Sequence, residues 1–358
     1  MIAAVFNGPG EMDVREVETP EIGAGEVLVE VKANTVCGTD VRILRGEKTT
    51  GIYPPSILGH EFAGRVATTG GRVEGYEVGG PVAMSPVIPC RRCFYCKRDM
   101  ENACANWKAM GYEIDGGLSE YVRIPADAVE AGCLFAVRED LPPEQLALAE
   151  PLSCCVNGQR RSPVEIEDSV LIMGSGPIGL FHLQLALLAG AGTVIVSEPS
   201  DSRRAIAKDL GAHVAVDPSS EDLPAIVAEA TDGLGVDTAI ICIGVPQLVN
   251  EALELARKGG RINIFAGLAN EGWAEVAANL IHYNELEVTG TTGSRRSDYE
   301  IALRLIESGR VKVDRMVSHR FPLESAVEAL DVAAGGEGIQ GGGDAVTRET
   351  RSHQRSGA

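Results

Sequence analysis

The stretch that decides the fold is Ser169-Val170-Leu171-Ile172-Met173-Gly174-Ser175-Gly176-Pro177-Ile178-Gly179. Its first five residues are typical of a short buried strand, and a helical run follows from Leu180 to Ala189. The glycine spacing between them is that of a turn that holds a dinucleotide pyrophosphate at the N-terminus of a helix. The residues expected to bind the cofactor in this turn are Gly174, Gly176, Pro177, Ile178 and Gly179.

The next predicted strand, from Thr193 to Ser197, ends at an acidic residue, Glu198. A carboxylate at this position can accept hydrogen bonds from both ribose hydroxyls, and it would repel a 2′-phosphate. The sequence therefore favours NAD over NADP. Arg203 and Arg204 follow closely, and a basic side chain there can also cradle a phosphate, so we count Arg203 among the cofactor-binding candidates.

Further strands and helices alternate along the rest of the chain. The predicted strands are 214–217, 237–242, 261–265 and 287–290, which bring the total to six and predict a complete doubly wound parallel sheet. Beyond residue 290 we expect amphipathic helices at 298–308 and 323–334. The segment 335–358 is rich in Gly, Arg, Ser and Thr without periodicity, and we expect it to be disordered.

The first part of the chain, up to about residue 123, has short extended segments broken by Gly and Pro, which predicts a β-rich domain. Cys37 follows one predicted strand, 26–33, and His60 and Glu61 precede another, 64–68. A thiolate, an imidazole and a carboxylate suit a zinc ion that keeps an open, catalytic position. Glu150 could supply a fourth donor or hold the metal's water.

A second group of potential zinc ligands consists of four cysteines within fifteen residues: Cys90, Cys93, Cys96 and Cys104. Four thiolates so spaced can enclose one tetrahedral zinc and leave no site for water, which predicts a structural site. An iron-sulfur cluster, unrelated buried cysteines and a nucleic-acid-binding zinc ribbon are the alternatives. Nine cysteines in all, an odd number, favour metal ligation in a reducing compartment over a disulfide framework.

Composition sets the class of protein. The chain has 358 residues, of which 44% are hydrophobic and 23% charged, as in globular proteins of two domains. Lys plus Arg total 32 against 51 for Asp plus Glu, a formal charge of -19, so we expect no binding to nucleic acid or to an anionic membrane. The sequence has no apolar run that could cross a bilayer and no signal peptide, so we expect a cytoplasmic protein.

With both ligand groups and the glycine-rich turn in this order, the chain resembles the zinc-dependent medium-chain dehydrogenases, especially the branch of sorbitol and threonine dehydrogenases. The resemblance implies an α/β protein with a GroES-like β-rich catalytic domain at 1–153, to which 291–334 returns, and a doubly wound Rossmann domain at 154–290. It also implies one catalytic zinc, one structural zinc, and a homodimer or homotetramer. Thr39 matches the hydroxyl that takes the proton of the alcohol.

The implied activity is the oxidation of a secondary alcohol of a polyol or sugar alcohol to a ketone, with hydride transfer to NAD. Two departures from the family bear on it. Arg42 stands where many members have a proton-relay histidine, and Ser294 stands where sorbitol dehydrogenase has an arginine that helps to hold the polyol. Arg295 and Arg296 come next, as solvated charges or as contacts for a phosphate.

Two alternatives remain at the level of function. One is the same chemistry on threonine, a diol or a sugar-alcohol phosphate. The other is a zinc- and dinucleotide-binding protein without catalytic activity.

Overall fold

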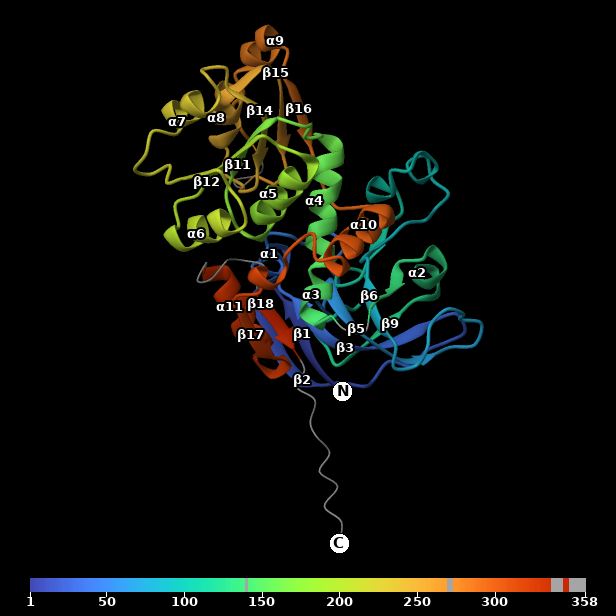
Figure 1. The fold of residues 1–358 in the computed structure, drawn as a ribbon. Helices are drawn as coiled ribbons and strands as arrows, with labels where there is room; N and C mark the ends of the chain where they lie inside the picture. The colour runs from blue at the N-terminus through green and yellow to red at the C-terminus, as the bar shows by residue number, and fades with distance from the viewer. Residues whose placement is uncertain (139–140, 269–272, 336–343, 348–358) are drawn as a thin grey trace. The chain divides into compact units, whose positions relative to one another are not determined.

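The computed structural model describes residues 1–138, 141–268, 273–335 and 344–347, and the chain divides into two units (Figure 1). Unit 1 contains Met1–Arg98, Ala103–Leu148 and the described residues from Val317 on, and unit 2 contains Asp99–Asn102 and Ala149–Met316. None of the helices in the described ranges has the length and apolar character needed to span a bilayer.

Unit 2 is built on a parallel sheet with the strand order β13-β12-β11-β14-β15-β16. In sequence this is the order third, second, first, fourth, fifth, sixth, which is the doubly wound arrangement predicted above. The strands are β11 (Ser169–Met173), β12 (Thr193–Ser197), β13 (Val214–Val216), β14 (Val236–Ile241), β15 (Ala256–Ile264) and β16 (Glu287–Gly290).

Helices cover both faces of this sheet. Leu171 and Met173 belong to an apolar cluster with α7 (Leu223–Ala230) and α8 (Leu248–Leu255). Ile172, which points the other way along the strand, faces the start of α5 (Pro177–Ala189), because a Cβ atom added at Gly179 would lie 3.4 Å from its Cγ2. The other helices of unit 2 are α4 (Ala149–Arg161), α6 (Asp201–Asp209), α9 (Ala278–Asn284) and α10 (Arg296–Glu307).

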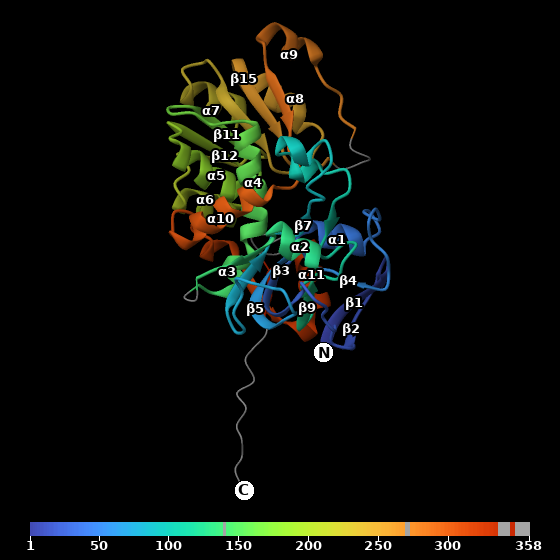
Figure 2. The ribbon, with the colours of Figure 1, turned by 90° about the vertical axis from the view of Figure 1, so that its right-hand side faces the viewer.

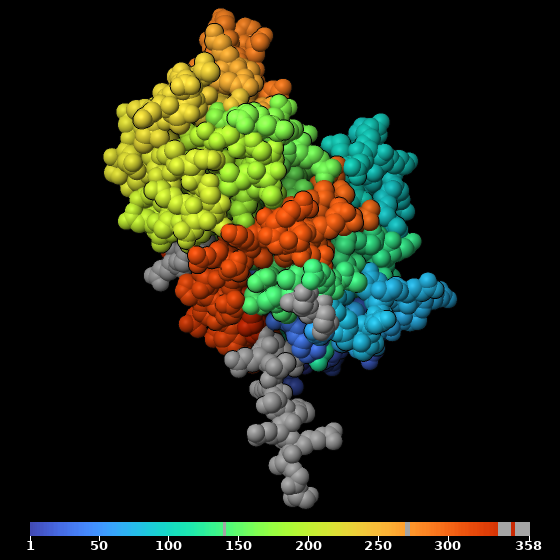
Figure 3. Space-filling view, viewed as in Figure 1, coloured from blue at the N-terminus to red at the C-terminus, as the bar shows by residue number. Residues whose placement is uncertain are grey.

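Helix α4 packs on α5 and on α10, and Figure 3 shows α10 as an orange ridge on the molecular surface. This packing explains where the units separate. The sequence analysis placed the boundaries at 153/154 and 290/291, whereas the structure keeps α4 and α10 together in unit 2 and divides the chain at 148/149 and 316/317.

Unit 1 is β-rich, as predicted, and Figure 2 shows β3, β5 and β9 of its largest sheet. The strand order of this sheet is β10-β6-β5-β3-β18-β17, with β9 also paired to β3. Its strands are β3 (Val27–Thr35), β5 (Glu61–Thr69), β6 (Pro81–Met84), β9 (Tyr121–Ile124), β10 (Leu134–Ala136), β17 (His319–Pro322) and β18 (Asp344–Thr347). The two smaller sheets are made of β1 (Ile2–Gly8), β2 (Glu11–Glu16) and β4 (Ser56–Ile57), and of β7 (Val87–Ile88) and β8 (Lys108–Ala109). The helices are α1 (Gly38–Leu44), α2 (Ala126–Ala131), α3 (Pro143–Ala147) and α11 (Ala326–Gly335).

Strand β18 corrects the expectation that 335–358 is disordered. Residues 344–347 pair with β3 on one side and with β17 on the other, and Ala345 and Val346 are buried. Burial of these two apolar side chains stabilises a strand that the polar surroundings conceal in the sequence. The rest of the predicted tail, 336–343 and 348–358, lies outside the described residues.

Candidate functional site

The pairing of β3 with β5 brings Cys37, His60 and Glu61 together. Thr35, the last residue of β3, lies opposite Glu61, the first residue of β5, in an antiparallel register. The residues just beyond these two ends therefore meet at one edge of the sheet. One ligand atom from each of Cys37, His60 and Glu61 lies within 4.8 Å of the other two, so the structure brings together these three members of the predicted catalytic set.

The backbone at Gly59 directs His60 into this cluster. Gly59 has a φ of +90°, a conformation that side chains disfavour, and an added Cβ would lie 2.6 Å from Asn34 Oδ1. Any larger residue would therefore push His60 out of its position.

Asp40 orients two of the three ligands, although the sequence analysis gave it no role. Its Oδ2 accepts a hydrogen bond of 3.0 Å from the backbone N–H of Cys37, which caps α1, and its Oδ1 lies 3.2 Å from His60 Nδ1. The bond to Nδ1 leaves Nε2 of His60 for a metal. An acidic residue three positions after a helix cap was the available signal. The Thr35 hydroxyl donates a hydrogen bond to Glu61 Oε2 and so orients the third ligand.

The electrostatics of this cluster fit a cation. Burial raises the pKa of the Cys37 thiol to about 11, and the Glu61 carboxylate adds to the effect. Without a positive charge, the thiol keeps its proton. A zinc ion favours the thiolate instead and couples its own binding to the release of that proton.

The other two residues of the predicted catalytic set lie in different elements. Thr39 is in the first turn of α1, half-buried, two residues after Cys37, and its hydroxyl makes no hydrogen bond within the described part of the chain. Glu150 belongs to unit 2, where it is buried in the first turn of α4 and its Oε1 lies 3.7 Å from Cys154 Sγ.

The four clustered cysteines converge as predicted. Cys93 Sγ lies 3.5 Å from Cys96 Sγ and 3.8 Å from Cys104 Sγ. A tetrahedron with zinc–sulfur bonds of about 2.3 Å has edges of about 3.8 Å, so these distances fit four thiolates around one zinc. Backbone N–H groups support the charged form: those of Cys96 and Ala105 lower the pKa of Cys93 to about 6.

Asp99–Asn102, between the third and fourth cysteines, is held by the turn before α10. Arg295 Nη1 donates to Asp99 Oδ2 at 2.8 Å, and Arg296 Nη2 donates to Glu101 Oε1 at 2.9 Å. Both arginines are thus engaged in ion pairs and are not simply solvated. The neighbouring Ser294 is buried, and its hydroxyl is bonded to that of Ser153 at 2.7 Å, so it is occupied in packing.

The dinucleotide turn has the predicted geometry. Gly174 follows β11 with a φ of +95°, and a Cβ at Gly179 would lie 1.9 Å from the Gly174 carbonyl oxygen, so the close approach of helix and strand requires glycine there. Gly176 caps α5, and Pro177 and Ile178 form its first turn. The N-terminus of α5, where Gly176 and Ile178 are partly exposed, is suited to phosphate groups.

Glu198 lies beside this turn because β11 and β12 are adjacent parallel strands, with Met173 opposite Ser197. Its buried carboxylate accepts hydrogen bonds from the backbone N–H groups of Ser175 at 2.8 Å and Ser200 at 3.0 Å, and Arg203 Nη1 lies 3.4 Å away.

Ile243 is a further candidate for contact with the nucleotide, and the sequence analysis missed it. It follows β14, is 47% exposed, and its Cβ would lie 3.4 Å from a Cβ at Gly174. The gap between β11 and β14 is where the strand order reverses, which is where ligands bind in such sheets. An exposed apolar residue after the fourth strand was the signal.

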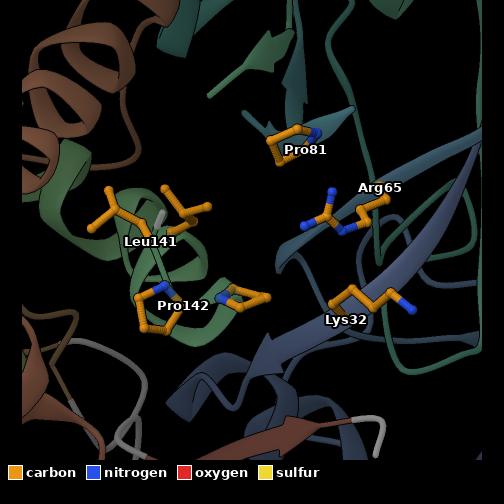
Figure 4. A pocket seen from close by; sticks show the side chains of 8 residues that line it. Lys32, Arg65, Pro81, Leu141 and Pro142 are labelled. Atoms are coloured by element: carbon orange, nitrogen blue, oxygen red, sulfur yellow. The ribbon is translucent and has the colours of Figure 1, made fainter. Parts of the chain in front are cut away.

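A pocket of about 260 Å³ in unit 1 contains none of these candidates. Figure 4 shows Lys32, Arg65, Pro81, Leu141 and Pro142 around it. Its two basic side chains already have partners, since Lys32 pairs with Glu30 at 2.6 Å and Arg65 donates to the Gly79 carbonyl at 2.7 Å.

Two family models match the chain. That of the zinc-binding dehydrogenases matches residues 177–308, and that of the alcohol dehydrogenase GroES-like domain matches residues 23–131. These matches confirm the predicted combination of a GroES-like domain and a Rossmann domain.

Comparison with known proteins agrees over nearly the whole chain. It is 36% identical to L-threonine 3-dehydrogenase of Pyrococcus furiosus over 327 residues, 90% of this chain and 92% of the relative. It is 34% identical to D-arabitol-phosphate dehydrogenase of Enterococcus avium, over 93% and 94% of the two chains. A solved Sinorhizobium meliloti protein, described as a zinc-binding dehydrogenase bound to NADP, has a TM-score of 0.88 and 34% identity over 97% and 98% of the chains. The chain therefore belongs to the zinc-binding medium-chain dehydrogenases and is a zinc- and NAD(P)-dependent dehydrogenase.

Proposed function

We propose that this enzyme oxidises a secondary alcohol to a ketone and transfers the hydride to NAD. The observation that carries the proposal is the set of Cys37, His60 and Glu61, of which His60 and Glu61 are buried and Cys37 is partly buried, with Asp40 bonded to the backbone of Cys37 and to the ring of His60. A catalytic zinc site has about three protein ligands, which leave one position open for the substrate, and a hydrogen-bond partner that fixes the histidine tautomer.

The residues at the two proposed zinc sites have distinct roles in this proposal. A bound zinc ion supplies a Lewis acid that lowers the pKa of the substrate hydroxyl. Cys37, His60 and Glu61 hold the ion, Asp40 fixes the His60 ring, and Thr39 accepts the proton of the alcohol. Glu150 is the proposed fourth donor or the residue that holds the metal's water. The four clustered cysteines hold a second, structural zinc.

The cofactor is held by unit 2. The turn from Gly174 to Gly179 and the N-terminus of α5 bind the pyrophosphate, and Ile243 gives the nucleotide an apolar contact. Glu198 accepts the ribose hydroxyls. We propose NAD and not NADP because both nearby arginines are paired with acidic groups: Arg203 with Glu198, and Arg204 with Asp201.

The proposed substrate is a polyol, a sugar alcohol or its phosphate, or threonine. Threonine dehydrogenase and arabitol-phosphate dehydrogenase are among the relatives, which supports the charged members of this group. The buried position of Ser294 supports them as well, because this residue cannot replace the arginine that holds a neutral polyol in sorbitol dehydrogenase.

The test is reduction of NAD and of NADP in the presence of polyols, diols, sugar-alcohol phosphates and threonine, with and without prior removal of zinc by a chelator. We expect chelator-sensitive turnover with NAD on one group of substrates. The variant Cys37→Ser should lose at least about a hundredfold in kcat/KM while it keeps its secondary structure by circular dichroism. Undiminished activity in zinc-free protein would contradict the proposal.

A further inference from the structure

Lys48 lies near the proposed metal ligand His60, with the ring of Tyr112 in contact with both. Its Nζ is 4.9 Å from the centre of the Tyr112 ring, and the centre of that ring is 5.3 Å from the His60 ring. Trp107 packs against Tyr112 from another side, with 6.3 Å between the ring centres. Tyr112 is thus in contact with both the ammonium group and a proposed metal ligand.

The ammonium group of Lys48 has no hydrogen bond or ion pair with any of the described residues. The cation beside it, Arg42, is different, because Arg42 lies 3.7 Å from Glu47 and is well exposed. The charge of Glu113 raises the pKa of Lys48, but one carboxylate oxygen of Glu113 accepts a 3.0 Å hydrogen bond from the backbone N–H of Ala109. Although the net charge of the chain is -19, the half-buried ammonium of Lys48 thus has no acidic hydrogen-bond partner in the part of the chain that the structure describes.

This position disfavours a positive charge in the absence of a ligand. Burial lowers the pKa of Lys48, and the charge of Arg42 lowers it further. The ring of Tyr112 compensates through a cation–π contact, which is weaker than a charged hydrogen bond. A bound anion would stabilise the charged form of Lys48 and so offset both the cost of burying the ammonium and its repulsion by Arg42.

We propose that Lys48 binds the anionic group, a carboxylate or a phosphate, of the substrate whose hydroxyl reacts at Cys37, His60 and Glu61. The inference rests on the proposed function and specifies its substrate class. The separation between the ammonium and the His60 ring cannot exceed the sum of the two ring distances above. A small alcohol that carries a carboxylate or phosphate at one end can span it.

The experiment compares matched substrates with and without the anion. The pairs are D-arabitol 1-phosphate with D-arabitol, and L-threonine with L-threonine amide. The variant Lys48→Gln removes the charge, and Lys48→Arg keeps it. Arg45→Gln is the control because it removes an exposed cation at the C-cap of α1, three residues before Lys48.

We expect Lys48→Gln to lower kcat/KM for the anionic member of the accepted pair by about ten- to a hundredfold, chiefly through KM, since this is what a charged hydrogen bond contributes. The neutral member should change less than about twofold. Lys48→Arg should recover most of the loss, and Arg45→Gln should show none. The pair that responds identifies carboxylate or phosphate as the anion.

An equal fall in kcat for charged and neutral substrates would overturn the proposal, since Lys48 would then act in proton transfer. If no substrate is turned over, the proposed function fails, but Lys48 is still tested by calorimetric titration of the wild type and Lys48→Gln with both anionic compounds in the presence of NAD. Binding that is lost in Lys48→Gln and kept in Arg45→Gln supports the anion site. No binding to the wild type, or equal binding to Lys48→Gln, overturns it.

Discussion

At the scale of single residues, His182 shows how burial fixes a protonation state. It lies fully buried in α5 of unit 2, its ring packs edge-on against Phe265 at 4.7 Å, and its Nδ1 is 3.4 Å from Gln159 Nε2. Burial lowers its pKa to about 3. The folded protein therefore holds this histidine neutral, as a packing residue.

This histidine predicts a loss of stability in acid. Below about pH 6.5 the unfolded chain binds a proton at His182, whereas the folded chain keeps this histidine neutral. The free energy of unfolding should therefore fall by about 1.4 kcal/mol per pH unit until the pH reaches the pKa of His182 in the folded protein. Above that pH the contribution is complete. Denaturant unfolding of wild type and His182→Gln between pH 7 and 5 measures the difference in slope.

The variant should lack this part of the pH dependence, even if it is less stable at pH 7. The control is His282→Gln, which changes an exposed histidine in α9 and should keep the wild-type slope. Equal slopes for wild type and His182→Gln would show that the folded protein can accept the proton.

The sequence could predict the two groups of potential metal ligands that the structure brings together, and the glycine-rich turn, because their residue types and spacings carry the signal locally. It could not predict Lys48, whose place beside His60 depends on the fold around Tyr112. Asp40 lies between these cases, since its capping position is readable but its bond to His60 depends on the pairing of β3 with β5.

At the scale of elements, segment Asp99–Asn102 is anchored within unit 2 by side-chain contacts. Segment 99–102 is bound to the turn before α10 through two ion pairs and through Asn102 Nδ2, which donates to the Thr292 carbonyl at 3.0 Å. Glu101 is nearly buried, so its pair with Arg296 is the one that counts for stability.

We expect Glu101→Gln to lower the melting temperature of the zinc-loaded protein by about 2–4 °C, because Arg296 would keep its charge without a full partner. Differential scanning fluorimetry measures the shift. The matched control is Glu130→Gln, which breaks the exposed 3.1 Å pair with Arg91 of the same cysteine loop and should change little. Equal melting temperatures for both variants would contradict a structural role for the Glu101 pair.

Strand β18 and the boundaries of the units mark the limit of sequence reasoning for elements. Strands β11 and β12 of unit 2 and the end of β14 are short apolar runs, as expected for the inner strands of a parallel sheet that is covered on both faces. In β18, Ala345 and Val346 stand among polar residues, and only their pairing with β3 and β17 makes a strand of them. Such long-range pairing has no local signature.

At the scale of the whole molecule, the parallel sheet of unit 2 has an open edge. Strand β16 pairs with β15 on one side only within the described ranges. The segment that leads into β16 carries exposed apolar side chains, since Trp273, Val276 and Tyr283 are 78%, 47% and 73% exposed. Val288, in β16 itself, is 38% exposed. An edge of this kind is a template for another strand.

We propose that a second copy of the chain covers this edge in solution, so that the protein is a homodimer or a homotetramer built from such dimers. Two copies of β16 related by a twofold axis would run antiparallel and pair their open edges, which makes a closed, isologous contact. The variant Val288→Lys places a charge on the edge and should halve the mass measured by light scattering after size exclusion. Val78→Lys, at a 68% exposed position in unit 1, is the control and should leave the mass unchanged. A wild-type monomer at micromolar concentration, or a dimer that tolerates the lysine at 288, would place the contact elsewhere or remove it.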